Sequence, residues 1–547
     1  MEDEVDLKVK LILAVALGGS VVLLVWLYNV MVVKTHRLRL KLQNQGIRGP
    51  SPSFLLGNIP DMRRIQTQAQ SLQKDDYSSI AHDWLSTLLP YFGKWRNEYG
   101  PVFMYSTGNI QILCITDVEM VKEMSLHTSL SLGKPSYLSK DRGPLLGKGI
   151  LSSSGPLWAH QRKIIAPEFF PDRVKGMVNL MAEATTSLLR SWESRIEREG
   201  GVVADITVDE DLRSLSADII SKTSFGSSYS KGEEIFSKLQ TLQKVMSKGI
   251  IGIPALRYLS LYIRQSQTLH SNILKFSVSY ERYLPTKNNK EVRKLEKQID
   301  TMILELGKQR MEGQHQEQDL LQLIVEGANS CSDHNGNSLN FSRDRFIIDN
   351  CKNIYFAGHE TTAITASWSL MLLAAHPDWQ AQARAEVLET CKGSLPNADS
   401  LKRMKMLTMV IQETLRLYPP AIFVIREALE DINIKGILVP KGMNIQIPIP
   451  VLHQSPELWG PDASKFNPER FVNGVLGACK APQAYMPFGL GPRICAGQHF
   501  AMTELKVVLS LLLSRFSFSL SPEYHHSPAF RLVVQPEHGV CLQVRRV

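Results

Sequence analysis

The sequence has no C-x-x-C pair, and its seven cysteines are an odd number. This usage argues against a disulfide framework and for a reducing compartment. There is no zinc-finger spacing and no aromatic-basic nucleic-acid motif, so nucleic acid is not an expected partner. Only 21% of the residues are charged and 44% are hydrophobic, which is typical of a globular chain and not of a disordered one. The net charge of +9 fits anionic lipid or an acidic protein partner, and it fits a merely solubilising excess equally well.

An apolar run at 11–33 predicts a transmembrane helix. As a helix this run would be about 34 Å long, against about 30 Å for the hydrocarbon core of a bilayer. A cleaved signal peptide fits badly, because the run is too long, acidic residues precede it and no small-x-small cleavage site follows. Basic residues gather after the run, so the positive-inside rule predicts a lumenal segment at 1–10 and a cytosolic remainder.

The remainder of the chain divides into a linker and one large unit. Residues 34–57 are basic and then proline-rich, which predicts a short stiff linker before a domain at 58–547. Alternation at 100–117 predicts a β-hairpin, and 531–547 has hairpin character around 536–539. A long helix is predicted over 343–375, because its apolar pattern is stopped by a proline.

The stretch at 488–497, with the sequence FGLGPRICAG, organises the rest of the chain. Cys495 lies in this glycine-rich loop, before a periodic apolar run at 500–513 that predicts a helix. Loop N–H groups and the positive end of that helix would lower the pKa of the thiol and suit it to bind iron. The glycines leave room for a flat macrocycle, and Arg493 could pair with one of its carboxylates. For this loop alone, a buried structural cysteine is the alternative.

The hexapeptide Ala357-Gly358-His359-Glu360-Thr361-Thr362 lies in the middle of the long helix. Ala357 and Gly358 are small, so the backbone could approach a ligand closely. The i, i+3, i+4 spacing puts Ala357, Glu360 and Thr361 on one face. The Thr361 hydroxyl could bond to the Ala357 carbonyl and loosen the helix, and an acid beside a hydroxyl suits proton delivery. A kinked core helix whose threonine caps its own backbone fits the hexapeptide alone about as well.

Two weaker motifs accompany these. Trp158 and Arg162 are four residues apart and share a helix face. Glu413 and Arg416 share another, and Arg470 follows in a later N-P-E-R motif. Alone, the first fits a packed tryptophan with a solvated arginine, and the second fits an exposed pair worth about 0–1 kcal/mol.

Together these motifs resemble the cytochrome P-450 family of haem-thiolate monooxygenases. The loop at 488–497 matches the family pattern F-x-x-G-x-R-x-C-x-G, and 357–362 matches A/G-G-x-D/E-T-T/S. The resemblance runs from about Gly46 to the end of the chain. It implies a mainly α fold with small β-sheets, a triangular prism preceded by one N-terminal transmembrane helix. It also implies a single-pass protein of the endoplasmic reticulum membrane, with the catalytic domain at 58–547 in the cytosol.

The resemblance gives the named residues their roles. It implies haem b with Cys495 as the axial thiolate and metal ligand, and electrons from NADPH through a membrane-bound, NADPH-dependent diflavin reductase. Glu360 and Thr361 would be catalytic. The remaining roles are haem binding for Trp158, Arg162, Arg426, Phe488, Arg493 and Cys495, a structural network of Glu413, Arg416 and Arg470, and a substrate pocket at Ile422, Phe423 and Val424. The last three could equally be ordinary strand residues.

The substrate is expected to be lipophilic. The stretches at 48–50, 56–60 and 357–362 resemble a plant clan that oxidises terpenoids and hormones, and the branch that acts on gibberellins and related diterpenoid acids is most similar. A triterpenoid or other hormone oxidase of the same fold is an alternative. A haem-thiolate isomerase or dehydratase is another, and a non-catalytic membrane-bound haem sensor or carrier is a third. Thr361 argues against the isomerase, and the acid–alcohol pair argues against the sensor.

Overall fold

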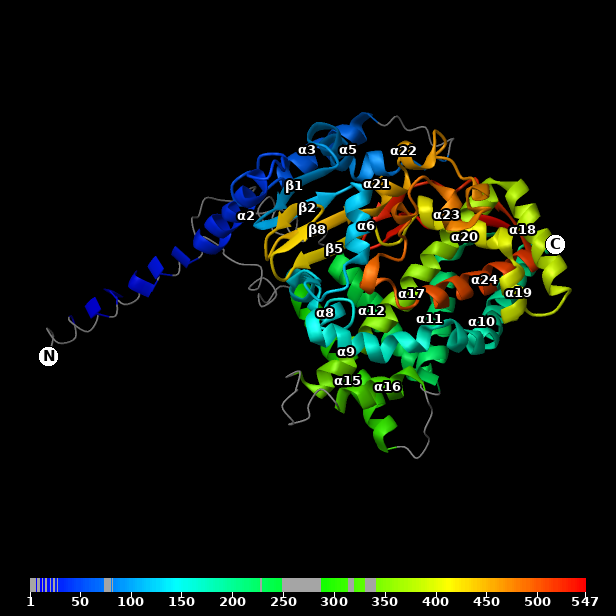
Figure 1. The fold of residues 1–547 in the computed structure, drawn as a ribbon. Coiled ribbons are helices and arrows are strands. Elements are labelled where there is room, and N and C mark those ends of the chain that lie inside the picture. Colours follow the sequence, from blue (N-terminus) through cyan, green and yellow to red (C-terminus); the bar gives the residue numbers. More distant parts are fainter. Residues whose placement is uncertain are drawn as a thin grey trace.

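The computed structural model describes residues 28–72, 80, 82–226, 229–247, 287–312, 319–329 and 341–547, together with scattered positions between 6 and 26. Most of these residues are helical, and the strands form small sheets. Figure 1 shows the largest sheet on one side of the molecule and the long helices on the other. The fold is therefore mainly α with small β-sheets, as the sequence predicts.

The α-helices are α2 (Lys34–Gln43), α3 (Ile59–Leu72), α4 (Leu85–Leu88), α5 (Pro90–Tyr99), α6 (Val118–Leu126), α7 (Ser136–Asp141), α8 (Gly143–Leu146), α9 (Gly155–Ile165), α10 (Pro171–Arg198), α11 (Val208–Phe225), α12 (Tyr229–Ser247), α15 (Lys287–Glu312), α16 (Leu320–Asn329), α17 (Arg343–Ala375), α18 (Pro377–Cys391), α19 (Ala398–Arg403), α20 (Lys405–Leu417), α21 (Ile449–His453), α22 (Pro456–Trp459), α23 (Gly474–Ala478) and α24 (Gln498–Arg515).

The strands are β1 (Val102–Thr107), β2 (Ile110–Ile115), β3 (Leu132–Gly133), β4 (Val203–Thr207), β5 (Phe423–Ala428), β6 (Ile432–Ile434), β7 (Ile437–Val439), β8 (Asn444–Pro448), β9 (Phe516–Leu520), β10 (Pro528–Phe530), β11 (Val534–Pro536) and β12 (Cys541–Arg546). They form a five-stranded sheet in the order β1-β2-β8-β5-β3, a three-stranded sheet β4-β12-β9 and the pairs β10-β11 and β6-β7.

The central helix is α17, which has the bounds predicted from the sequence. Its side chains from Phe346 to Ala374 are buried almost without interruption, so it is covered on nearly all sides. A helix with apolar or satisfied side chains all round belongs in a core. Its neighbours include α11, α16 and α24, of which α11 and α24 are labelled beside it in Figure 1.

The segment predicted to be a linker packs against the large sheet. The backbone N–H of Met104 in β1 donates to the Arg48 carbonyl at 2.9 Å, and the N–H of Asn58 donates to the Ser106 carbonyl at 2.7 Å. A Cβ at Gly49 would lie 1.8 Å from the Met104 carbonyl oxygen, so only glycine permits this approach. Residues 48–58 therefore cover the outer edge of β1, which is an edge strand.

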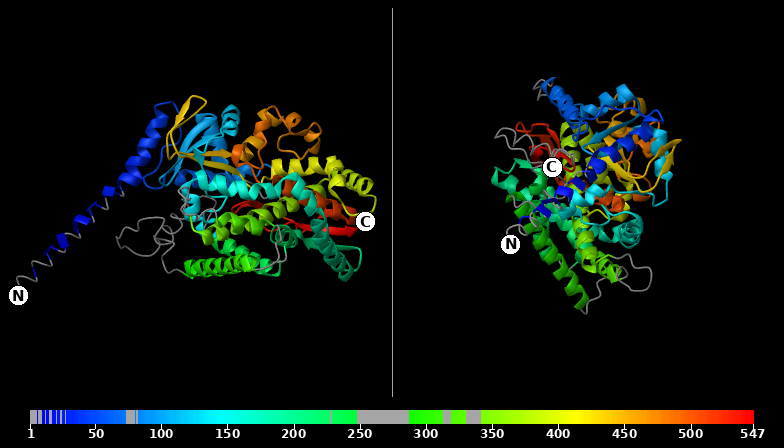
Figure 2. Two further views of the ribbon diagram at one scale, coloured as in Figure 1. Left: turned by 60° about the horizontal axis from the view of Figure 1, so that its bottom comes forward. Right: turned by 90° about the vertical axis from the view of Figure 1, so that its left-hand side faces the viewer.

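The predicted transmembrane helix at 11–33 falls largely outside the described residues. Within the part of the chain that the structure describes, no helix is long and apolar enough to cross a membrane. Apolar side chains that are described in this stretch are highly exposed, with Leu17 at 70% and Val22 at 69%. Figure 2 shows this N-terminal stretch leading away from the rest of the molecule.

One hairpin prediction is confirmed and the other is wrong. β1 and β2 pair as an antiparallel hairpin within the predicted 100–117. At the C-terminus, however, β11 pairs with β10, whereas β12 pairs with β9 and β4. The turn at Gly539 therefore sends the chain to a different sheet. Local alternation predicted the two strands but could not identify their partners.

Candidate functional site

The loop at 488–497 is closed by its own backbone. The N–H of Cys495 donates to the Phe488 carbonyl at 2.8 Å. Gly489 and Gly491 have φ values of +80° and +64°, a region that favours glycine. At Gly491 a Cβ would also lie 3.0 Å from the Ser125 carbonyl oxygen. α24 starts at Gln498, directly after the loop, which confirms the predicted helix.

The thiol of Cys495 does not have the lowered pKa that the sequence suggested. The side chain is accessible at the loop surface, yet protein atoms crowd around it on most sides. This crowding raises the pKa of Cys495, whereas the Gly497 N–H and the Arg162 guanidinium lower it to a smaller extent. A predicted loop N–H contact is present at Gly497, but burial outweighs it because burial penalises the charged form. The thiolate therefore needs a further positive charge, and a coordinated metal ion provides one.

Helix α9 supports the loop from one side. The guanidinium of Arg493 lies 4.1 Å from the centre of the Trp158 ring, a cation–π contact. Arg162 Nη1 donates to the Ile494 carbonyl at 2.7 Å, and Arg493 Nη1 donates to the Ser153 carbonyl at 3.0 Å. Trp158 and Arg162 thus contact the cysteine loop from one helix face.

Lys134, Arg426 and Arg493 form what we term the cation cluster. Burial and the neighbouring cations Arg426 and Arg162 lower the pKa of Arg493 to about 9. Burial lowers the pKa of Arg426 to about 10, and its Nη2 donates to the Leu490 carbonyl at 3.2 Å. Burial, Arg426 and Arg493 hold the pKa of Lys134 well below its ordinary value. These shifts show that positive charge is unfavourable here without an anion.

Lys134 was not among the predicted site residues. It follows β3 and lies far from Arg426 and Arg493 in the sequence. Only the pairing of β3 with β5, which carries Arg426, brings it to the cluster. A lone lysine in a glycine- and serine-rich segment gave no signal of this contact.

The hexapeptide of α17 places its threonines and its acid in different surroundings. Thr361 Oγ1 donates to the Ala357 carbonyl at 2.9 Å, which confirms the expected side-chain bond. Glu360 is 2% exposed, and its carboxylate lies 3.3 Å from Arg213 Nε and 3.5 Å from His359 Nε2. The acid is therefore held by a cation from α11, a partner that sequence spacing could not reveal.

Gly358 serves helix packing rather than ligand approach. A Cβ at this position would lie 2.6 Å from Cγ1 of Ile220 on α11. The expectation that this glycine opens the backbone to a ligand is therefore wrong, because the neighbouring helix occupies that side. His359 is packed against Phe236 with ring centres 5.0 Å apart.

Glu413, Arg416, Arg470 and Asp462 form what we term the paired network. Arg416 donates to both oxygens of Glu413 at 2.7 Å, and neither residue is exposed. Arg470 Nε lies 3.3 Å from Glu413 Oε1, and its Nη1 donates to Asp462 at 2.9 Å. The structure thus brings the three predicted residues together and adds Asp462, which the sequence motif did not include.

The three residues predicted to line a substrate pocket do not share one surface. Ile422 is 1% exposed and belongs to the main hydrophobic core. In β5, Phe423 packs toward Phe92 and Phe530, whereas Val424 lies in the separate core under the large sheet. Successive side chains of a strand point to opposite faces, so a pocket on one face can be lined by only one of Phe423 and Val424.

Residues 86–544 match the family model described as cytochrome P-450. The chain belongs to the cytochrome P-450 family. It is 51% identical to cytochrome P-450 714C2 of Oryza sativa subsp. japonica, over 96% of each chain. It is 46% identical to cytochrome P-450 714C3 of the same plant, over the full length of both. Identity to cytochrome P-450 714A2 of Arabidopsis thaliana is also 46%, over 94% of this chain and 95% of that one.

Membership of the cytochrome P-450 family makes the chain a haem-dependent monooxygenase. The family uses haem b with cysteine thiolate ligation, and its electrons come from NADPH through a reductase. Haem b carries two carboxylates, so its site should contain cations that lack an internal counterion.

The residues around the loop fit this requirement. No ion pair among the described residues includes Arg162, Arg426 or Arg493. Arg493 Nη2 is buried and has no hydrogen-bond partner in that part of the chain. A small cavity of about 20 Å³ beside the cluster is lined by Trp158, Arg426 and Arg493. An unpaired guanidinium nitrogen beside a crowded thiol suits a cofactor that bears both a metal and carboxylates.

Proposed function

We propose that this chain is an NADPH- and O2-dependent monooxygenase that hydroxylates or epoxidises a lipophilic plant terpenoid, such as a gibberellin or a related diterpenoid acid. The observation that carries the enzymatic part is the cysteine loop beside a cation cluster without carboxylates. Haem b, when bound, supplies the iron at which dioxygen is reduced with two electrons. The chain's own residues hold that cofactor, exclude water and move protons.

Cys495 would ligate the iron, and the cation cluster would bind the propionates. Arg493 presents a buried N–H without a partner among the described residues, and the Trp158 ring supports its guanidinium at 4.1 Å. Arg162 fixes the carbonyl of Ile494, the residue before the cysteine, and so sets the direction of the thiol. Phe488 closes the loop through its carbonyl.

Thr361 and Glu360 would supply and relay protons. The Thr361 hydroxyl donates to the Ala357 carbonyl, so its lone pairs remain free to accept from a water. Glu360 lies in the preceding position and is buried with Arg213. A hydroxyl that orders water next to a buried acid is what proton delivery requires.

The test of the haem-thiolate assignment replaces the sulfur of Cys495 with oxygen. We expect reduced wild-type protein with carbon monoxide to show the red-shifted Soret band of a thiolate-ligated haem, and Cys495→Ser to lose it. Binding of haem by the variant, measured by absorbance, serves as the control for folding. A red-shifted band in Cys495→Ser would falsify the assignment of Cys495.

The test of the proton-delivery role removes the hydroxyl group of Thr361. We expect Thr361→Ala to oxidise NADPH at a similar rate while product falls and peroxide rises. Thr361→Ser keeps a hydroxyl and should restore much of the coupling. Unchanged coupling in Thr361→Ala would contradict the role of this hydroxyl.

The substrate class rests on sequence similarity. The chain is most similar in its motifs to a plant clan of terpenoid oxidases, and the three relatives above come from plants. Incubating the enzyme and a reductase with gibberellins, ent-kaurenoic acid and triterpene acids, followed by product analysis, tests it. Turnover of triterpene acids alone would favour the alternative, and no turnover across the panel would remove the terpenoid assignment.

We also infer attachment to the endoplasmic reticulum membrane by residues 11–33, with a membrane-bound diflavin reductase as electron donor. The apolar composition of this stretch and its exposed leucines and valines support an anchor. The net charge of +9 suits an acidic partner. Protease protection of microsomes tests the topology, since only the segment at 1–10 and the anchor itself should be shielded.

A further inference from the structure

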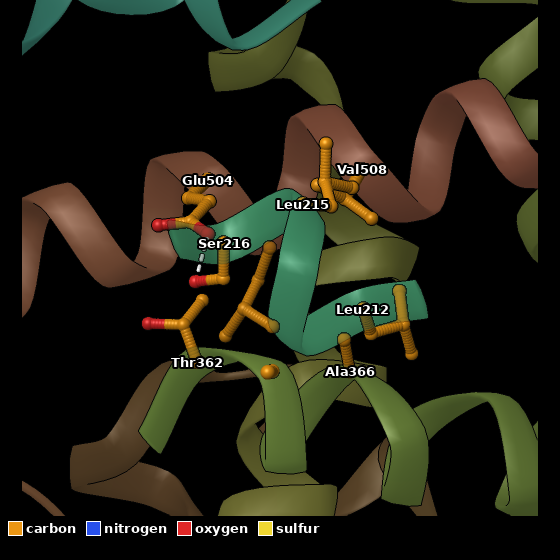
Figure 3. A pocket seen from close by; sticks show the side chains of 9 residues that line it. Leu212, Leu215, Ser216, Thr362, Ala366, Glu504 and Val508 are labelled. Atoms are coloured by element: carbon orange, nitrogen blue, oxygen red, sulfur yellow. Dashed lines mark hydrogen bonds between the residues drawn. The ribbon is translucent and has the colours of Figure 1, made fainter. Parts of the chain in front are cut away.

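Helix α17 packs in two different ways along its length. In its C-terminal half, side chains from α11 and α24 such as Leu212, Leu215 and Val508 meet Thr362 and Ala366 around a small, mostly apolar cavity (Figure 3). In its N-terminal half, the side chains that face the segment before α9 are polar and buried. Burying a polar side chain is unfavourable unless it has a hydrogen-bond partner, so these partners show what this half of the helix holds.

Asp349, Asn350 and Asn353 form what we term the polar ladder. At most 4% of each residue is exposed, and the i, i+3 and i+4 spacing brings Asn353 beside the other two. Each accepts a hydrogen bond of 2.8 to 3.1 Å from a backbone N–H of the loop at 147–154: Lys148 donates to Asp349, Ile150 to Asn350, and Leu151 to Asn353. These N–H groups lie between α8 and α9, in neither helix nor strand, so they need such partners.

The loop at 147–154 is fixed from two sides. A Cβ at Gly149 would lie 2.5 Å from the Asp349 carbonyl oxygen, so the loop backbone lies directly against α17. On the other side, Gln161 of α9 donates from Nε2 to the Lys148 carbonyl at 2.9 Å and accepts from Ser153 Oγ. The loop is therefore held between α17 and α9, and a displacement from α17 would move its far end as well.

The far end of this loop holds two members of the cation cluster. Arg493 Nη1 donates to the Ser153 carbonyl at 3.0 Å, and the backbone N–H of Lys134 donates to Ser154 Oγ at 2.8 Å. Trp158, whose ring lies 4.1 Å from the Arg493 guanidinium, follows directly in α9. With Nη1 bound to Ser153, the buried Nη2 of Arg493 has no partner among the described residues. The position of the loop therefore sets the direction of this unpartnered N–H.

We propose that the polar ladder positions the cation cluster for the haem propionates. Its three residues are positioning residues, which act through the loop at 147–154 on Arg493 and Lys134. This inference rests on the proposed binding of the propionates by that cluster. It gives the N-terminal half of α17 a part in holding the cofactor, separate from the proton-handling motif at 357–362.

Resonance Raman spectroscopy of the haem-loaded enzyme tests the proposal, because the bending bands of the propionates respond to their hydrogen bonds. Gly149→Ala inserts one methyl group between the loop and α17 and should shift these bands. Gly176→Ala is the matched control, since the same change in α10, where a Cβ would meet nothing within 4 Å, should leave the bands unmoved. Unmoved bands in Gly149→Ala would overturn the proposal.

Arg493→Leu separates failure of this inference from failure of the proposed propionate site. It removes a proposed propionate ligand and should shift the bands by itself. A shift in Arg493→Leu without one in Gly149→Ala would overturn the role of the polar ladder and leave the propionate site intact. No shift in either variant would contradict both.

Asn353→Leu approaches the same contact from the helix and guards against misfolding of Gly149→Ala. It keeps the approximate size of the side chain and removes the acceptor for the Leu151 N–H. We expect transfer of haem to apomyoglobin to become about tenfold faster, at the lower end of what a hydrogen bond to a charged group contributes. Ser369→Ala, which removes a buried hydrogen bond elsewhere on α17, is the control. A lower unfolding midpoint with unchanged haem transfer would show that the ladder only stabilises the fold.

Discussion

The paired network and the cation cluster both bury arginines, yet they are built on opposite rules. In the paired network each guanidinium meets a carboxylate, and Arg416 and Glu413 are completely buried. In the cation cluster Arg426 and Arg493 contact backbone carbonyls, the Trp158 ring and other cations, and neither forms an ion pair with a described carboxylate. The first arrangement satisfies itself and serves stability. The second leaves positive charge without a carboxylate partner among the described residues, and on this difference we base the proposal that these arginines bind an anionic ligand.

The largest effect is expected from breaking the paired network at its centre. Arg416→Met leaves Glu413 buried with the longer contact to Arg470, at 3.3 Å, and the N–H of Asn467, at 3.0 Å. Removing one member of a buried ion network costs about 3–5 kcal/mol, because a charge stays unpaired. Urea unfolding followed by circular dichroism measures this loss. A midpoint equal to that of wild type would mean that the paired network does not stabilise the fold.

Arg493→Leu should not destabilise the cofactor-free protein, in contrast to the loss of stability expected for Arg416→Met. It removes one of several mutually repelling cations, so the unfolding midpoint without haem should stay constant or rise. Haem retention should fall by about 10- to 100-fold, since a charged hydrogen bond contributes about 1.5–3 kcal/mol. Transfer of haem to apomyoglobin measures retention, and Arg531→Leu, at an exposed site, is the control. A destabilised cofactor-free protein with normal retention would make Arg493 a structural residue.

Glu504 is a buried acid that forms no ion pair among the described residues, and it can therefore be compared with Glu413 of the paired network. Folding raises its pKa from 4.5 to about 8, so the neutral carboxyl contributes stability that is fully present below pH 4.5 and lost as pH rises through about 8. The stability difference between wild type and Glu504→Gln should therefore shift against wild type across this window, by at most about 1.4 kcal/mol per pH unit. Urea midpoints of both proteins at several pH values measure it. A constant difference would mean that Glu504 is ionised in the folded protein.

The smallest effect is expected at the rim of the paired network. The Asp462 side chain is 38% exposed and is bound by Arg470, whose hydrogen bond is the main cause of its lowered pKa. A partly solvated pair of this kind contributes about 0–1 kcal/mol. Asp462→Asn should lower the unfolding midpoint only slightly. A loss as large as that of Arg416→Met would place Asp462 at the energetic centre of the network.

Local patterns predicted the parts of the site that are contiguous in sequence. The loop around Cys495, the bounds of α17 and the Thr361–Ala357 bond follow from spacing within a few residues. Arg213 and Lys134 were missed because helix packing and strand pairing, not spacing, bring them to Glu360 and Arg426.

Three further features depended on tertiary contacts in the same way. The pKa of Cys495 was misjudged, since the crowding around the thiol arises from the folded chain. Gly358 was assigned to ligand approach because Ile220, its neighbour on α11, is distant in sequence. The strand at Cys541–Arg546 was given the wrong partner for the same reason.

The close approach of residues 48–58 to β1 has a practical consequence for handling this protein. An uncovered edge strand offers its free N–H and C=O groups to other chains and invites aggregation. A shortened version that begins near Lys34 would keep this cover. One that begins at Ile59 would lack it, including the close contact between Gly49 and Met104. The boundary for making a water-soluble form is therefore set by a sheet edge and not by the end of the apolar stretch alone.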